Sequence, residues 1–527
     1  MPKEKLKTDF VMLLTLDGWG IEEKSEGNPF DQAILSNWNK LISSYPSTSL
    51  NLVSYPEDYS RVPDLSQLGY YVLGTGSETF NHLSRINQSI RDKSFFKNQI
   101  ILKALNNCQK NQTKLHLAGL LSDAEKYSSF EHLKALLKMA REKGLDQVYL
   151  HLFLDGVDTP KDRGLALIKE LEKTFKKLKI GKIASLSGRF YAMDRNNYWQ
   201  ERTAKTYEAL VEGRGKLTKS PERAIRESYK KQIFDKELVP TVVTNAEGKG
   251  RGLEEGDSLI FFNFRGDRIR QLAKAVSMPG LNKFPRKKIV KNPHLCFLTE
   301  YEKNIPAPIA FPAGLKKKSF FQLLREQGVE DLRLSEINKF AHINNIWDGF
   351  SDYTEPRQNR LMYASEKKDT NLSLMESTEK IGKRLIKEAR EKNHNFILAN
   401  LANFDISARQ GNFNATVKYI EQTDKILGKL SSAVNKKNGT LILTSTAGWA
   451  ENLIIKKTEE VNQDYTFNPL PVIIINSTLE GKKMSLGDPV EGDLSLLKPE
   501  KNLSHLHYTI LKLLGLGSKA DQDLSLL

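Results

Sequence analysis

The sequence predicts an α/β fold in which strands and helices form layers. Short apolar runs such as 10–16, 148–154 and 472–475 have the length and composition of strands that are buried on both faces, as in a parallel sheet. Segments with apolar residues at helical spacing lie between such runs, and this alternation is typical of an α/β layer fold. Hydrophobic residues make up 39% of the 527-residue chain, so we expect large cores in two or more domains, or in one domain with a large insertion.

The first apolar run, residues 10–16, stops at Asp17, which is followed by Gly18, Trp19 and Gly20. In open α/β sheets, ligands bind outside the carboxyl ends of the strands. A carboxylate at this position is therefore placed to hold a metal ion or a phosphate-bound cation. An Asp-Gly pair that only turns the chain is an equally good interpretation.

A serine near closely spaced glycines is the next landmark, after a helix that we expect to end near residues 44–46. Ser66 precedes Gly69, Gly74 and Gly76. Such a serine is either a nucleophile at a turn or the amino-terminal cap of a helix, and the cap is the commoner case.

From about residue 82 to 312, predicted strands alternate with predicted helices. We expect helices over 131–143 and around 168–175, and strands at 148–155 and 259–265. The charged residues that follow apolar runs here are Asp155, Asp158, Arg189, Arg195, Arg265 and Arg268. Ordinary ion pairing would explain any one of these arginines, but four placed alike predict a bidentate site for phosphate or carboxylate.

The final third continues the same pattern. A helix carrying Ile381, Leu385 and Ala389 precedes a strand at 395–400, which we expect to end near Asp405. A long helix then places Val417, Ile420, Leu427 and Leu430 inward and is stopped by Asn438-Gly439, and strands follow at 440–446 and 472–475.

Charge and cysteine content exclude some classes of protein. The net charge of +16 favours anionic partners, but the basic clusters 176–179, 286–288 and 316–318 are short and scattered, so nucleic-acid binding is not expected. Cys108 and Cys296 form no C-x-x-C motif, which argues against a zinc knuckle and fits a reducing cytoplasm. We expect no signal peptide and no membrane span, because no apolar run is long enough.

Six motifs, taken in order, closely resemble those of the cofactor-independent phosphoglycerate mutases. They lie at 16–20, 83–87, 119–123, 153–160, 187–195 and 261–268, and the resemblance runs nearly end to end. It implies an alkaline-phosphatase-like three-layer domain at 1–81 and 313–527, interrupted by an inserted α/β phosphotransferase domain at 82–312. Members of this family interconvert 3- and 2-phosphoglycerate in glycolysis, through a serine beside two manganese ions, with substrate held by arginines of the inserted domain.

Carried over residue by residue, the resemblance places the nucleophile at Ser66 and two metal-binding aspartates at Asp17 and Asp405. One metal position would keep Asp405 alone, and the other would keep Asp17 and Ser66. The residues that replace the four other family ligands are Arg409, Thr446, Ala447 and Tyr465. Arginine and alanine offer no lone pair, and threonine and tyrosine are poor neutral ligands, so neither position should hold a divalent transition metal firmly.

The substrate side is only partly altered. Tyr127 stands where the family has a histidine, and Val157 where it has an arginine. The family's substrate-binding residues that remain are Asp158, Arg189, Arg195, Arg265, Arg268 and Lys339. Arg409 could neutralise Asp17 and Asp405, clamp a bound phosphate, or point to solvent.

We therefore predict a cytoplasmic, monomeric homologue of the phosphoglycerate mutases that has lost mutase activity and needs no cofactor. Its expected ligand is a small phosphorylated or carboxylated anion. A first alternative is an active phosphoglycerate mutase or phosphatase that uses Ser66 and two manganese ions in an altered metal site. A second is a basic scaffold that binds a protein complex or nucleic acid, which only the net charge supports.

Overall fold

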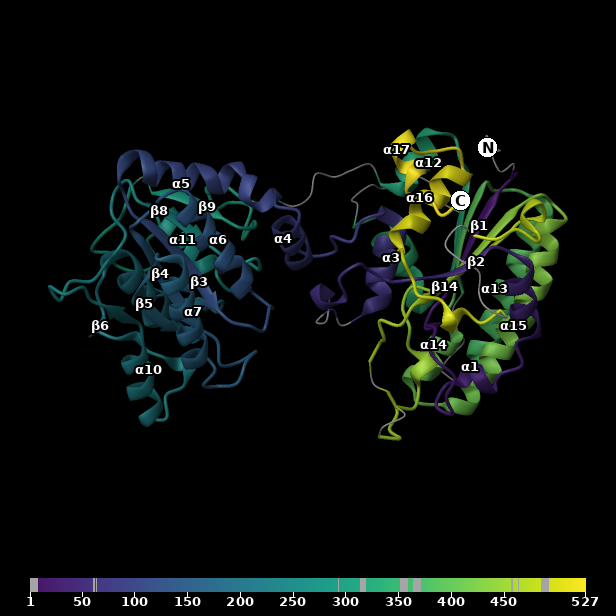
Figure 1. The fold of residues 1–527 in the computed structure, drawn as a ribbon, viewed down its shortest axis with the longest axis horizontal. Coiled ribbons are helices and arrows are strands. Elements are labelled where there is room, and N and C mark those ends of the chain that lie inside the picture. The colour runs from purple at the N-terminus through teal and green to yellow at the C-terminus, as the bar shows by residue number, and fades with distance from the viewer. Residues whose placement is uncertain are drawn as a thin grey trace. The chain divides into compact units, whose positions relative to one another are not determined.

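In the computed structural model, the chain divides into two compact units, unit 1 (1–80 and 316–527) and unit 2 (81–315) (Figure 1). The residues that the structure describes are 8–59, 62, 64–291, 293–312, 319–350, 359–363, 371–455, 458–462, 464–484 and 492–527. The predicted domain boundary at 313 and the basic cluster 316–318 lie outside these residues. Each unit is described by itself.

Unit 1 contains a seven-stranded sheet in the order β11-β10-β12-β1-β13-β14-β2. The central strand β1 pairs in parallel with β12 and β13, while β14 runs antiparallel to β13 and β2. Every residue of β1 is buried, as the sequence predicted for a run in which all residues but Thr15 are apolar. The strands are β1 Val11–Leu16, β2 Ser47–Leu50, β10 Asp331–Glu336, β11 Asn359–Tyr363, β12 Phe396–Leu401, β13 Thr440–Thr444 and β14 Leu470–Ile475.

Helices cover both faces of this sheet, which gives the three layers that the sequence predicted (Figure 1). Alternate residues of β1 point to opposite faces, so Met12 and Leu14 join one apolar cluster and Val11 and Leu13 join the other. The first cluster includes α1 Pro29–Gln32, α2 Ser36–Ser44, α13 Asn371–Glu391, α14 Asn403–Arg409 and α15 Phe413–Asn435. The second includes α3 Leu65–Thr75, α12 Phe320–Glu326 and α16 Ser504–Leu513, and α17 Lys519–Asp523 follows.

Unit 2 is built on a second seven-stranded sheet, in the order β6-β7-β5-β4-β3-β8-β9. All neighbours pair in parallel except β5 and β7. The strands are β3 Leu115–Leu121, β4 Val148–Leu154, β5 Lys182–Gly188, β6 Lys216–Thr218, β7 Thr241–Val243, β8 Ser258–Phe261 and β9 His294–Phe297.

Helices also pack on both faces of the sheet of unit 2. One apolar cluster joins the strands to α4 His82–Arg91, α5 Gln99–Asn111, α6 Phe130–Glu142, α7 Gly164–Leu178 and α10 Pro221–Lys230. The other joins them to α8 Arg189–Ala192, α9 Ala204–Tyr207 and α11 Arg270–Ser277. The predicted α/β class is therefore confirmed in both units.

Several local predictions need correction. The strand predicted to reach Arg265 is β8, which ends at Phe261, and the following residues form a loop. Asp405 lies inside α14 rather than at the end of a strand. The helix α15 ends at Asn435, before Asn438-Gly439, and Val417 is only half-buried because it lies at the edge of the apolar face.

The interpretation of Ser66 as a helix cap is wrong. Asp64 is the cap of α3, and its carboxylate accepts hydrogen bonds from the backbone N–H groups of Ser66 and Gln67. Ser66 is the second residue of α3 and is fully buried, so its side chain is free to face the end of the sheet. Within the residues described, no helix is both long and apolar enough to cross a bilayer.

Candidate functional site

The predicted metal-side residues meet in unit 1, at the carboxyl ends of β1, β12 and β13. Asp17 directly follows β1, Thr446 follows β13, Asp405 lies in the first turn of α14, and Ser66 lies in the first turn of α3. All four side chains are fully buried.

Two glycines allow this close approach. A Cβ on Gly69 of α3 would lie 2.0 Å from the carbonyl oxygen of Thr446, so only glycine lets the helix pack against that loop. Gly18 adopts a φ of +88°, and a Cβ there would lie 3.1 Å from the Cβ of Asp405. The glycine pattern that the sequence shows around Asp17 and Ser66 is therefore a packing requirement of the site.

Lys339 lies at the centre of these residues. It ends a short 3₁₀ turn, Ile337–Lys339, that directly follows β10, and only 3% of its surface is exposed. Its Nζ lies 2.9 Å from Asp17 Oδ2 and 3.2 Å from Asp405 Oδ2, and it donates a hydrogen bond of 2.9 Å to Ser66 Oγ. The three donors of the ammonium thus face three oxygens.

This environment keeps Lys339 charged. Burial lowers the pKa of Lys339, but the carboxylates of Asp17, Asp405 and Asp64 outweigh burial and hold that pKa above its ordinary value. A lysine that stays protonated cannot accept the hydroxyl proton of Ser66. The pair is therefore not a serine nucleophile with a lysine base.

Asp17 is saturated by donors of the protein itself. Besides the ammonium, it accepts hydrogen bonds from Thr446 Oγ1 at 2.7 Å, from Ser66 Oγ at 3.2 Å and from Tyr70 Oη at 3.2 Å. A carboxylate offers about four acceptor positions, so these four donors use them all. Burial first, and then the charge of Asp17, raise the pKa of Tyr70, which keeps its phenol protonated as a donor.

Arg409 occupies the other side of Asp405. Its Nε and Nη2 each lie 3.3 Å from one oxygen of that carboxylate, one helical turn away on α14. The guanidinium also lies 4.7 Å from the ring centre of Tyr465 and 5.0 Å from that of Trp449. Arg409 therefore neutralises Asp405, whereas Asp17 receives Lys339 instead.

These residues do not fit the two manganese ions that the family resemblance implies. The four replaced positions supply a guanidinium at Arg409, a hydroxyl already bonded to Asp17 at Thr446, a methyl group at Ala447 and a phenol packed on Trp449 at Tyr465. Among the described residues, no group of three or more His, Cys, Asp or Glu side chains could hold a metal ion. The guanidinium of Arg409, 3.3 Å from both oxygens of Asp405, would repel a divalent cation placed there.

A second set of predicted residues meets in unit 2, also at the carboxyl ends of strands. Arg189 follows β5, Arg265 and Arg268 follow β8, and Tyr127 follows β3, which lies between β4 and β8 in the sheet. The guanidinium carbons lie 5.0, 5.0 and 5.9 Å from the ring centre of Tyr127, and Arg268 Nε donates to its hydroxyl at 2.9 Å. We call these three arginines and Tyr127 the arginine cluster.

Asp158 and Asp155 anchor the buried member of the arginine cluster. Arg189 Nη1 donates to both carboxylates, at 2.6 Å in the case of Asp158, and Lys126 Nζ lies 2.7 Å from Asp158. Burial raises the pKa of Asp158, but Arg189 and Lys126 outweigh it and lower that pKa below its ordinary value. Arg189 is therefore fixed in place, whereas Arg265 is about half exposed and pairs with Asp267.

Two further predicted positions of unit 2 lie at its surface. Arg195 is exposed on the loop after α8, and Val157 is 55% exposed. Lys339 belongs to unit 1 and contacts Asp17 and Asp405 there. Sequence reasoning missed Tyr70, although its position four residues after Ser66 on a helix places both on one face.

Comparison with known proteins points to one family. The family model for the amino-terminal part of BPG-independent PGAM matches residues 86–303. The chain is 35% identical over 483 residues to the 2,3-bisphosphoglycerate-independent phosphoglycerate mutase of Clostridium perfringens, covering 90% of this chain and 93% of that one. It is 33% identical over 510 residues to the protein of the same name from Acetivibrio thermocellus, covering 94% and 98%.

A solved structure has a similar fold. The phosphoglycerate mutase of Leishmania mexicana, determined at low cobalt concentration, aligns with 100% of this chain and 98% of its own, with a TM-score of 0.50 and 23% sequence identity.

Proposed function

The chain belongs to the family of 2,3-bisphosphoglycerate-independent phosphoglycerate mutases, and on that premise we propose that it binds a small phosphorylated or carboxylated anion without the family's two-metal phosphoryl transfer. One observation carries this proposal. The guanidinium of Arg409, which replaces a ligand of the family, lies 3.3 Å from both oxygens of Asp405, where the resemblance places a metal ion.

The proposed loss of activity follows from what an ammonium lacks. A divalent metal ion lowers the pKa of an oxygen nucleophile and acts as a Lewis acid on the phosphoryl oxygens. Lys339 supplies positive charge but has no vacant coordination position, and it cannot take the proton of Ser66 while it stays charged. If the two ions supply about 5 kcal/mol at the transition state, their loss slows the reaction several thousandfold.

The anion-binding half of the proposal rests on unit 2. The arginine cluster holds three guanidinium groups around one ring, and two of them reach the surface with capacity for bidentate contacts to phosphate or carboxylate. Unit 2 also carries all of the excess positive charge of the chain. It contains 44 Lys and Arg against 26 Asp and Glu, a net charge of +18, which would attract an anion to the cluster.

An active mutase is the second candidate, and the similarity to named mutases over nine-tenths of the chain favours it. It would use Ser66 with an altered metal site. Two measurements separate the candidates: the metal content of the purified protein, and turnover of 3-phosphoglycerate in an enolase-coupled assay with added manganese. Manganese-dependent turnover that Ser66→Ala abolishes would overturn the proposal and establish the active enzyme.

Calorimetric titration with 3-phosphoglycerate tests the binding half. We expect measurable heat, with affinity lowered about tenfold or more by Arg265→Ala, because a charged hydrogen bond contributes about 1.5–3 kcal/mol. Arg223→Ala is the matched control, since Arg223 is a 77% exposed arginine of the same unit that pairs with Glu227. Heat that neither variant alters, or no heat from the wild-type chain, would contradict binding at the arginine cluster.

A further inference from the structure

A groove of about 780 Å³ lies on the surface of unit 2, between α6 and the segment that ends α4. One wall is a stripe along α6, and the other is the end of α4 with the 3₁₀ turn Ser94–Lys97. None of the residues discussed above as metal, nucleophile or anion-binding positions lines it. We call it the α4–α6 groove.

Three apolar residues line this groove: Ile90, Phe96 and Ala135. Ile90 and Phe96 are partly exposed, so a partner could remove apolar surface from water there. Phe95 is fully buried in the core of unit 2, and its ring meets that of Phe96 edge to face with centres 5.8 Å apart. The buried ring anchors the turn, so Phe96 is held at the groove before any partner arrives.

Basic residues outnumber acidic ones around these apolar side chains. The charged residues that line the groove are Arg91, Lys93, Lys97, Lys134, Lys138, Glu131 and Glu142. On α6 the charges pair with each other, because Lys134 contacts Glu131 and Lys138 lies 3.9 Å from Glu142. The excess positive charge therefore belongs to the opposite wall.

Two lysines of that wall are available to a partner. Lys93 and Lys97 are exposed, and no carboxylate among the described residues forms an ion pair with either. Asp92 precedes Lys93, but it does not line the groove and accepts a hydrogen bond of 2.8 Å from the backbone N–H of Ser94. A carboxylate of a partner would thus find cations beside an apolar surface.

The order of charges along α6 selects among anionic partners. The lining residues run from Glu131 to Glu142 at helical spacing, a stripe of about 16 Å, with Lys134 and Lys138 between the two glutamates. A membrane surface or a nucleic acid carries negative charge throughout and would set phosphates against both glutamates. A peptide can confine its carboxylates to the middle, and about three turns of helix match the length of the stripe.

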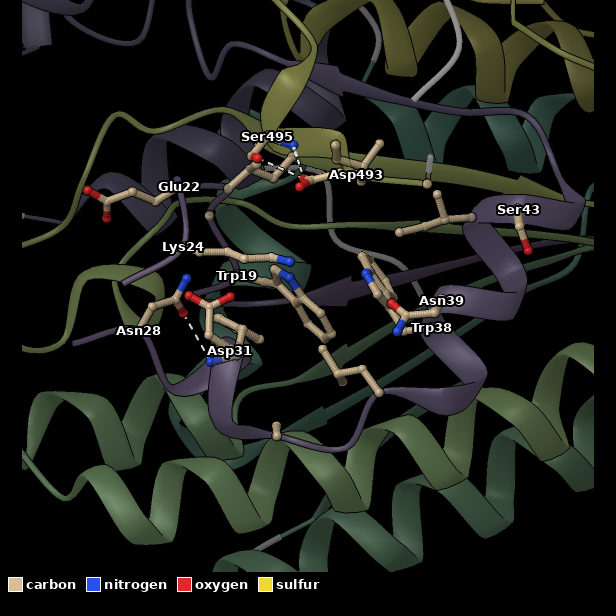
Figure 2. Close-up of a pocket in the computed structure, with 18 residues that line it drawn as sticks. Trp19, Glu22, Lys24, Asn28, Asp31, Trp38, Asn39, Ser43, Asp493 and Ser495 are labelled. Atoms are coloured by element: carbon tan, nitrogen blue, oxygen red, sulfur yellow. Dashed lines mark hydrogen bonds between the residues drawn. The ribbon is translucent and has the colours of Figure 1, made fainter. Parts of the chain in front are cut away.

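The pocket beside Trp19 in unit 1, of about 510 Å³, has the opposite balance of charge (Figure 2). The charged residues that line it are Glu22, Asp31 and Asp493 with the single cation Lys24. An acidic partner is therefore opposed there and favoured at the α4–α6 groove.

We propose that the α4–α6 groove docks a short helical segment of another protein, with apolar side chains on one face and Asp or Glu beside them. The apolar side chains would cover Ile90 and Phe96, and the carboxylates would pair with Lys93 and Lys97. The partner is a macromolecule at a surface separate from the arginine cluster, so this proposal stands independently of the anion proposed there.

Fluorescence anisotropy of the full chain with a labelled synthetic peptide tests the charged half. The probe is a helix of about three turns with two leucines one turn apart and glutamates beside them. Physiological ionic strength screens long-range attraction to the basic unit. Lys93→Glu combined with Lys97→Glu should weaken binding about tenfold, because two attractions become repulsions. The matched control is Lys110→Glu with Lys177→Glu, exposed lysines of unit 2 outside the groove, which should leave affinity unchanged.

A second peptide, with serines in place of the leucines, tests the apolar half at the same charge. It should bind about tenfold more weakly than the leucine peptide. Phe96→Ala should weaken binding of the leucine peptide, and 3-phosphoglycerate should not displace that peptide. No binding of the leucine peptide, equal binding of both peptides, or equal loss in the control variant would overturn the proposal. So would phosphatidylserine vesicles or a DNA duplex that displaced the peptide from the wild-type chain.

Discussion

Replacing Lys339 by methionine should destabilise unit 1 by about 3–5 kcal/mol, because it leaves buried carboxylates without their counter-charge. At an effective dielectric constant of about 20, each of the contacts at 2.9 and 3.2 Å provides about 5 kcal/mol of attraction, from which the cost of burying the ammonium is subtracted. With only 3% of Lys339 exposed, solvent screening is small. Asp17 suffers most, since Asp405 keeps Arg409.

Urea unfolding followed by tryptophan fluorescence measures this loss in the right unit. Four of the five tryptophans, Trp19, Trp38, Trp347 and Trp449, belong to unit 1, so the fluorescence change reports mainly on that unit. The matched control is Lys383→Met, because Lys383 is 74% exposed in its pair with Glu379. That change should cost no more than about 0.5 kcal/mol.

A double variant gives the reasoning its sharpest check. Asp17→Asn added to Lys339→Met removes the orphaned charge and should recover at least about 1 kcal/mol of the loss. If Lys339→Met costs no more than Lys383→Met, or if Asp17→Asn lowers stability further in the double variant, the ammonium does not balance the two aspartates and the account of the site fails.

Three further results are expected. Burial lowers the pKa of His116 and of His151, and it lowers the pKa of His132 to about 3, so these rings stay neutral in the folded chain. The same rings take up protons near pH 6.5 in the unfolded chain, so unit 2 should be most stable above that pH and should lose stability progressively below it. Urea unfolding between pH 4 and 8 measures this change. Arg409→Ala should lower the free energy of unfolding by about 1 kcal/mol, because the Arg409 side chain is 37% exposed and solvent partly screens its pairing with Asp405. A loss above about 3 kcal/mol in urea unfolding would contradict that screening. Under the proposed function, EDTA or added manganese should leave the Tm of the native chain unchanged in calorimetry, whereas a rise of several degrees with manganese would indicate a working metal site.

Much of the fold could be predicted because its strands are buried on both faces. The burial of a run such as 10–16 can be predicted from its apolar composition, and the position of Asp17 at the end of that strand follows from where the apolar run stops. The gathering of Arg189, Arg265 and Arg268 could also be predicted, since parallel strands bring their carboxyl ends to one edge. The resemblance in motif order named the family correctly.

The position of Lys339 could not be predicted in the same way. The sequence shows it as one of 80 basic residues, and the resemblance grouped it with the substrate-binding arginines. Its neighbours within unit 1 depend on β10 pairing in parallel with β12, which carries the end of β10 to the loop before α14. Such a long-range register leaves no local signal. The cap at Asp64 was missed for a different reason, because a nearby serine offered an equally good cap by residue type.

Under the proposed function, the charges of the site in unit 1 account for how the fold persists without a metal centre. Asp17 and Asp405 carry two negative charges in a fully buried place, and a fold that loses its divalent ions must neutralise them or pay several kcal/mol. Lys339, a family residue that remains, and Arg409, which replaces a family ligand, bring two positive charges to these two carboxylates. Neutralising a carboxylate requires only charge, whereas phosphoryl transfer requires a Lewis acid and an ionised nucleophile. Under the proposed function, Arg409 in place of a metal ligand therefore keeps the buried charges balanced and preserves stability, although it cannot support phosphoryl transfer.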